Sequence, residues 1–266
     1  MKSMFRKVAP WVLLASSVAV AAGVITKEEV NKKVASLTAP YNNASTSMKI
    51  EFTDLNVDAV RALDFGINVA ITKEGAENKL ALQLKDASYH YGDGSAPTVQ
   101  GRLLMRLDLV KAFGQPTLND LGAQLEDIAK GAVAEYGKKY GEAVAVDVKM
   151  EDVKKDAEGN LLSARLRFNA SFDLAKLPAD LKPEDVELRS VKAVLAAGRN
   201  GISGRLEAVI NPQYKGFQSN EPGLKEYIEK LLSDDKDTYE EIGKALSSLD
   251  GIAEWLVTQK APEPQP

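Results

Sequence analysis

The strongest constraint on the fold is an internal repeat, in which the second half of the chain follows the pattern of the first. Residues 49–55 and 147–153 share one alternating pattern with an Asp at the same step, and Gly-Arg-Leu occurs at both 101–103 and 204–206. The second match has an offset of 103 residues (204 − 101) and the first an offset of 98 (147 − 49), so one connection differs in length. A period this long indicates a duplicated domain rather than a solenoid of short units.

The first 21 residues have the features of a secretory signal peptide. Basic residues open the segment, an apolar run covers 8–18, and Ala19-Val20-Ala21 supplies the small residues that precede cleavage. Because the run is shorter than the ~20 residues of a membrane-spanning helix, we expect a cleaved signal and a periplasmic or secreted protein. No stable membrane span is expected after cleavage. An uncleaved N-terminal anchor is the alternative.

Composition shifts and turn residues predict five parts: a signal peptide (1–21), an N-terminal helix and linker (22–46), a first β4-α repeat (47–140), a second β4-α repeat with two C-terminal helices (141–257) and a disordered Pro-rich tail (258–266).

The predicted mature chain is acidic. Cleavage after Ala21 removes three basic residues and no acidic ones, so the mature net charge is (34 − 3) − 38 = −7. Since phosphate binding needs clustered Lys and Arg, we expect no nucleic-acid partner.

Each half carries four segments in which apolar and polar side chains alternate. Such alternation predicts antiparallel strands with one dry face and one wet face. It slips by one residue at Thr53–Asp54, after Leu84, near Asp152 and before Val191, which indicates β-bulges.

Helical apolar stripes follow the strands in both halves, at 118–136 and at 224–256. The predicted fold class is therefore α+β: a tandem pseudo-repeat, each half a four-stranded curved antiparallel sheet followed by an amphipathic helix packed on its apolar face. Whether the halves form two modules or one elongated body stays open. Three pairs are expected to cap helices: Thr26 with Glu29, Thr117 with Asp120, and Asp237 with Glu240.

The residues that carry most enzyme chemistry are missing from the chain. It has no Cys and a single histidine, His90, which excludes cysteine nucleophiles, thiolate zinc sites and His-based triads. There is no glycine-rich phosphate loop, and the acidic run at 234–241 favours a helix N-terminus over a calcium site. We expect no enzymatic activity, no cofactor and no metal site.

The leading functional hypothesis is an exported protein that binds a lipid or another hydrophobic ligand between curved sheet and helix. Small inward residues, among them Gly101 and Gly204, would leave room on the apolar face. The expected lining is Tyr89, Tyr91, Met105, Phe168 and Phe172, each of which also fits an ordinary core position. The alternative is a structural or adaptor protein of the cell envelope with a fully packed core, which docks a protein partner.

Overall fold

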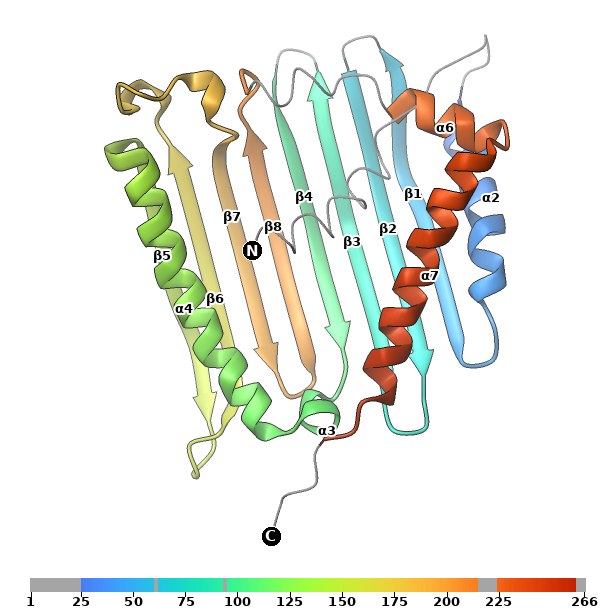
Figure 1. Cartoon of the computed structure of the whole chain (residues 1–266), viewed down its shortest axis with the longest axis horizontal. Coiled ribbons are helices and arrows are strands. Elements are labelled where there is room, and N and C mark those ends of the chain that lie inside the picture. The colour runs from blue at the N-terminus through green and yellow to red at the C-terminus, as the bar shows by residue number, and fades with distance from the viewer. Residues whose placement is uncertain (1–24, 60–61, 93–94, 215–223, 262–266) are drawn as a thin grey trace.

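The computed structural model describes residues 25–59, 62–92, 95–214 and 224–261, so the predicted signal peptide and the end of the tail lie outside the described residues. The chain forms an α+β fold built on one antiparallel sheet (Figure 1). Its strands are β1 (Thr46–Ala59), β2 (Ala62–Glu74), β3 (Lys79–Gly92), β4 (Ser95–Arg106), β5 (Val144–Lys155), β6 (Leu161–Phe172), β7 (Leu188–Gly198) and β8 (Gly201–Ile210). The α-helices are α2 (Lys27–Thr38), α3 (Leu109–Phe113), α4 (Gln115–Tyr140), α6 (Leu224–Leu232) and α7 (Lys236–Thr258), with short 3-10 turns at Ala39–Tyr41, Gly141–Ala143, Leu174–Lys176 and Pro183–Asp185.

The sheet has eight strands in the order β1-β2-β3-β4-β8-β7-β6-β5. Strands β4 and β8, the last strand of each half, pair antiparallel at the centre, from Thr98↔Val209 to Arg106↔Gly201. The sequence left open whether the two four-stranded halves form one body, and the structure joins their strands in one continuous sheet. The reason is that each four-stranded meander leaves its last strand with an unpaired edge, and the two edges satisfy each other.

The bulges expected from the alternation are confirmed by the strand registers. Pairing shifts between Phe52 and Asp54 in β1 and between Lys85 and Ser88 in β3. In the second half it shifts between Glu151 and Lys154 in β5 and between Leu188 and Ser190 in β7. Asp86 and Asp152, at two of these bulges, have φ of 50° and 54°, a left-handed conformation that Asp tolerates better than most residues.

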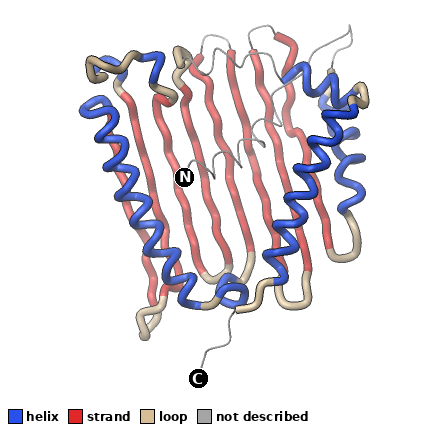
Figure 2. Tube along the Cα trace, viewed as in Figure 1, coloured by secondary structure: helices blue, strands red, loops and turns tan. Residues whose placement is uncertain are grey.

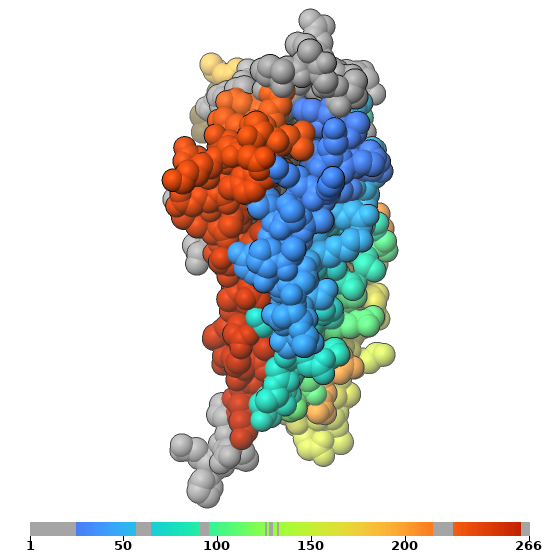
Figure 3. Space-filling model, turned by 90° about the vertical axis from the view of Figure 1, so that its right-hand side faces the viewer, coloured from blue at the N-terminus to red at the C-terminus, as the bar shows by residue number. Residues whose placement is uncertain are grey.

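The two faces of the sheet differ in chemistry. One row of paired residues on the helix-bearing face is apolar or Gly throughout and crosses all eight strands: Met150, Leu166, Leu195, Gly204, Leu103, Leu84, Val69 and Ile50. The neighbouring positions on each strand point to the other face, where charged residues such as Arg102, Arg165 and Lys192 are exposed. Seen from the edge at β1, α7 lies on one side of the sheet, and the side chains of the strands form the surface on the other side (Figure 3).

Two long helices occupy opposite halves of the apolar face (Figures 1 and 2). Helix α4 contacts β5 and β6, and Leu125 of α4 is buried with Leu166 and Ala197 of the sheet. Helix α7 contacts β2 and β3, and its residues Ile242 and Leu246 join a core cluster with the strands of the first half. Each helix therefore removes water from the strands below it but not from the whole sheet.

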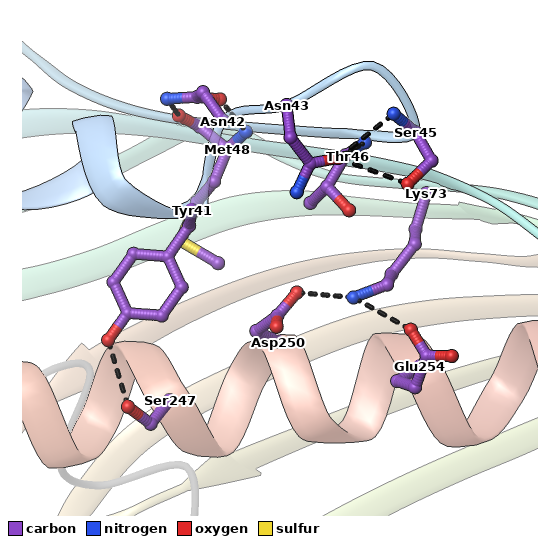
Figure 4. A network of polar contacts seen from close by, with 10 residues as sticks. All are labelled: Tyr41, Asn42, Asn43, Ser45, Thr46, Met48, Lys73, Ser247, Asp250 and Glu254. Atoms are coloured by element: carbon purple, nitrogen blue, oxygen red, sulfur yellow. Dashed lines mark hydrogen bonds and ion pairs between the residues drawn. The ribbon is translucent and has the colours of Figure 1, made fainter.

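A buried lysine ties α7 to the edge of the sheet (Figure 4). The Nζ of Lys73 in β2 lies 2.6 Å from the Oδ1 of Asp250 and 2.9 Å from the Oε2 of Glu254, both on α7. Burial alone would lower the pKa of Lys73, but the hydrogen bonds to the two carboxylates outweigh it and raise this pKa above its usual value. One turn away, the hydroxyls of Tyr41 and Ser247 are 2.8 Å apart.

Replacing Lys73 by Met is expected to lower the free energy of unfolding by about 1–2 kcal/mol, because two carboxylates that approach the sheet lose their shared cation. The control is Lys79→Met, since Lys79 forms an exposed ion pair with Glu74 at 2.8 Å and such pairs contribute about 0.5 kcal/mol or less. Urea unfolding measures both variants. Equal losses would contradict a specific anchoring role for Lys73.

The edge strand β1 is covered on its free side by polar side chains that replace a neighbouring strand. The amide of Asn31 in α2 accepts from the backbone N–H of Phe52 at 2.8 Å and donates to its carbonyl at 2.9 Å. Asn42 does the same for Met48, at 2.6 and 3.2 Å. These bonds satisfy backbone groups that would otherwise be open to pairing with another chain.

Of the three helix caps predicted from the sequence, the structure confirms one and differs from two. Thr26 and Glu29 form the expected capping box of α2. Helix α4 begins at Gln115 after Gly114, and the hydroxyl of Thr117 instead donates to the carbonyl of Phe113, so the expected Thr117–Asp120 cap is wrong. Helix α7 is capped by Asp235 rather than by Asp237, because the Asp235 carboxylate accepts from the backbone N–H of Thr238 at 3.0 Å.

Asp235→Ala is expected to lower the melting temperature by a few degrees near neutral pH. The hydrogen bond from the Thr238 backbone, with that from its side chain, lowers the pKa of Asp235 below its usual value. A lowered folded-state pKa stabilises the fold above the unfolded-state pKa, and this stabilisation is lost as the pH falls through the folded-state value. The difference between wild type and variant should therefore shrink in acid. Melting curves at several pH values measure this difference in melting temperature. A difference that does not change with pH would contradict a stabilising role for the ionised Asp235 carboxylate.

Candidate functional site

The centre of the helix-bearing face, over β4 and β8, is less covered than the strands directly beneath α4 and α7. Along one transverse row, Leu166 beneath α4 is 7% exposed and Val69 beneath α7 is 9% exposed. Leu103, between them on β4, is 41% exposed, as is Leu206 on the neighbouring strand β8. Exposure thus rises from both flanks toward the two central strands, and we call Leu103 and Leu206 the central floor.

Small neighbours account for the exposure of these two leucines. Leu103 pairs with Gly204, and Leu206 pairs with Gly101 on one side and Ala193 on the other. A glycine has no side chain that could pack beside the leucine it pairs with. Each leucine is therefore open to solvent on the side of that glycine. A Cβ at either glycine would meet its nearest neighbours at ordinary packing distances of 3.4–3.5 Å. The glycines are therefore not imposed by backbone crowding, and they leave space above the floor.

Helix α7 carries two exposed apolar side chains, Ile252 and Trp255, which we call the α7 wall. Asp250 and Glu254 face β2, since both bind Lys73. Successive helical residues are rotated by ~100°, so Ile252 lies on the opposite flank, toward the central strands. Ile252 and Trp255 are each 54% exposed. The Trp255 ring lies 5.7 Å from that of Phe113 in α3, which closely follows β4 in the chain.

Helix α4 lies on the other side of the two central strands. Figure 1 shows α4 and α7 converging on the end of the sheet where α3 lies, and α3 contacts both helices. We call the part of this face over β4 and β8 that carries the exposed Leu103 and Leu206 the open apolar strip. An exposed apolar strip of this kind, in contrast to single exposed leucines, is typical of a binding surface.

The aromatic residues expected to line a site are instead divided between the two helix-covered flanks. Tyr89 is half-buried and stacks on Phe65 with 5.7 Å between ring centroids, and Met105 packs against the same cluster. Phe168 and Phe172 pack on the other flank with Tyr136 of α4. The side chain of Tyr91 lies outside the described residues. The structure therefore separates Tyr89 from Phe168 and Phe172, whereas Met105 lies on the central strand β4, two residues from Leu103 on the same face.

The flank at the C-terminal end of α4 is a packed aromatic cluster. Tyr140 contacts Phe172 edge-to-face at 5.2 Å, and Tyr136 and Tyr140 stack at 6.2 Å. Burial, with a smaller contribution from Tyr140, raises the pKa of Tyr136 above its usual value. The raised pKa reflects the packing of the ring in this cluster, where burial disfavours the charged phenolate.

Sequence reasoning missed that four of the exposed large apolar residues are Leu103, Leu206, Ile252 and Trp255. A signal for the first two was present, because each follows a glycine by two positions on the same face of its strand. The exposure of Ile252 and Trp255 had no such signal, since both fit the apolar pattern of α7. It depends on which flank of the helix turns toward the uncovered centre.

A second hollow lies at the edge of the sheet, with a volume of about 110 Å³, lined by residues 43–47 together with Thr72, Lys73, Glu74 and Lys79. Its lining is polar, and the side chain of Asn43 already accepts from the backbone N–H groups of Ser45 and Thr46 (Figure 4). These bonds shape the turn into β1. The hollow is a structural turn whose polar groups are satisfied internally.

The described residues contain no group of three or more His, Asp or Glu side chains that could hold a metal ion. In the same part of the chain, no helix combines the length and apolarity that a bilayer crossing requires.

The chain matches no protein-family model, and comparisons with curated proteins and with solved structures find no significant similarity. Function must therefore be inferred from the site itself.

Proposed function

We propose that this chain is a non-enzymatic, exported protein that binds a lipid or another hydrophobic ligand on the open strip over β4 and β8. The observation that carries the proposal is the 41% exposure of Leu103 and Leu206 at the centre of an apolar face whose flanks are buried. Covering both side chains and the Ile252–Trp255 wall would contribute about 25 cal/mol for each Å² of apolar surface removed from water. An acyl chain or similar elongated apolar group fits this chemistry.

The alternative of an envelope adaptor with a fully packed core has less support. A packed core would bury the central leucines as deeply as Leu166 and Val69 in the same row. The difference in exposure along that row favours a ligand over the centre.

We further propose that the sheet arose by tandem duplication, with one four-stranded unit and its helix in each half. The strand order is consistent with this, since it reads β1 to β4 inward from one edge and β5 to β8 inward from the other. The repeated Gly-Arg-Leu segments also pair with each other at the centre, Arg102 opposite Arg205. The repeated segments thus meet antiparallel, so a local two-fold axis between these arginines would relate the halves.

Native mass spectrometry of the mature protein, purified without detergent, tests the ligand proposal. We expect a co-purifying acyl species, released by solvent extraction. The folded protein after extraction should increase the fluorescence of the hydrophobic dye ANS. A protein that carries no extra mass and leaves ANS dark while folded would refute the proposal. The same spectrum gives the mass of the protein itself. A mass that corresponds to a chain cleaved after Ala21 would support export.

A further inference from the structure

The outer face of the sheet, opposite the helices, carries basic side chains in register across six strands. Cross-strand pairing places five of them in one transverse row, interrupted by Val194: Lys85, Arg102, Arg205, Arg167 and Lys149. All five are exposed. The row is a property of the assembled sheet, because its members lie far apart in the sequence and meet only through the β4–β8 pairing.

At the second-half end of this row, neighbouring carboxylates neutralise the basic groups. Arg167 pairs with Glu151 at 3.1 Å, and Lys149 pairs with Asp147 at 3.2 Å. Arg165, on the same strand as Arg167, pairs with Asp152 at 2.9 Å. This part of the outer face is therefore a set of solvated ion pairs with little net charge.

The middle of the outer face, on β3, β4 and β8, is different, and we call it the central basic patch. It holds four basic residues (Lys85, Arg102, Arg106 and Arg205) and two acidic ones (Asp86 and Glu207), a balance of 4 − 2 = +2 in a chain whose formal net charge is −4. The guanidinium of Arg102 is bonded to Asp86, and Glu207 is bonded to Lys192 of β7 at 3.3 Å.

Within the described ranges, no carboxylate lies within 4.0 Å of Lys85, Arg106 or Arg205, although all are exposed. Arg102 and Arg205 also stand directly opposite each other across the central strand pair. Like charges in directly opposed positions destabilise a sheet. An anionic partner would remove this repulsion and supply the missing counter-charges.

We propose that the central basic patch is a docking surface for an acidic, Asp- or Glu-rich segment of a partner protein. Three of its four basic residues are Arg, whose planar fork binds carboxylates through paired hydrogen bonds. The side chains beside them are neutral and polar, namely Gln83, Gln100 and Ser203, with Leu104 half-buried. The patch thus lacks the exposed large apolar groups that surface-bound proteins insert into a bilayer, which favours protein carboxylates over lipid headgroups.

This surface lies on the face opposite the apolar strip, so a bound ligand and a docked partner would not overlap. A protein that holds an apolar ligand on one face and a partner on the other could receive or deliver that ligand at a defined place. The docking proposal stands on the charge arrangement alone and does not require that a ligand be found.

The test uses the full mature protein and a fluorescent oligoglutamate peptide as the probe, with binding followed by fluorescence anisotropy. We expect saturable binding that weakens as salt rises. Lys85→Glu with Arg205→Glu should weaken it about tenfold, and Lys85→Gln with Arg205→Gln by a smaller factor. The matched control, Lys154→Glu with Lys155→Glu on edge strand β5, makes the same change in net charge away from the patch and should bind within about twofold of wild type.

Circular dichroism of each variant verifies that the sheet is intact, which is expected because the replaced side chains are exposed. Equal loss of binding in the patch and control variants would overturn the proposal, since the effect would follow net charge alone. Absence of peptide binding would overturn it too. Binding to vesicles that contain phosphatidylglycerol, without binding to the peptide, would assign the patch to a lipid surface and contradict a protein partner.

Discussion

Replacing Leu103 and Leu206 together by Glu is expected to abolish uptake of a hydrophobic ligand while leaving the fold intact. Both side chains are 41% exposed on the central strands, so carboxylates at these positions stay hydrated in the free protein. Covering them with an apolar ligand would instead require desolvation of two charges, which costs several kcal/mol. We expect affinity for ANS or laurate, measured by titration, to fall at least about a hundredfold.

The matched control is Val153→Glu with Leu162→Glu, which changes two apolar side chains of similar exposure on β5 and β6. This variant removes as much exposed apolar surface but leaves the central floor unchanged, so its affinity should equal that of wild type. Loss of uptake in both variants would show that dye and ligand respond to surface hydrophobicity in general. Unchanged uptake in the Leu103/Leu206 variant would place the ligand elsewhere.

Gly201→Ala is expected to be the most damaging single substitution in the sheet, at about 3 kcal/mol or more in the free energy of unfolding. Gly201 opens β8 after the two-residue turn from β7 and has φ of 130°, a conformation that residues with a Cβ rarely adopt. A Cβ there would also overlap the carbonyl oxygen of Met105 on β4. The substitution therefore strains the turn and separates the two central strands.

Gly204→Ala provides the control on the same strand. Its added Cβ would approach the Cδ1 of Leu195 at 3.4 Å, a distance that small shifts can accommodate, and its φ is not in the left-handed region. We expect a change within about 1 kcal/mol. Urea denaturation of the two variants measures the difference. Similar values for both would contradict the importance of the close β4–β8 contact.

Sequence patterns predicted the local features of this fold well, because those features depend on neighbouring residues. The alternation located the strands, and each slip in it corresponds to an observed register shift, as at Thr53–Asp54. The capping box of Thr26 was likewise visible. The start of α7 was misplaced by two residues because Asp235 and Asp237 are chemically equivalent caps, and only the hydrogen bond to Thr238 distinguishes them.

The joining of two sheets into one was not predictable from local pattern. Pairing of β4 with β8 brings together residues about a hundred positions apart, such as Arg102 and Arg205, and no local signal specifies it. The candidate site depends on this joining. Phe168 and Phe172 attracted attention as large aromatic residues, yet they pack beneath α4, whereas the surface left open consists of leucines beside glycines at the junction.

The most direct test of the ligand site is methyl NMR of the leucine-labelled mature protein titrated with laurate. Binding on the strip over β4 and β8 requires that the methyl signals of Leu103 and Leu206 shift together, with saturation at a single dissociation constant. Leu118 of α4 and Leu246 of α7, which lie on the buried faces of these helices, should change little. Shifts confined to other leucines, or none at ligand concentrations that saturate ANS displacement, would contradict a hydrophobic site on the central strands.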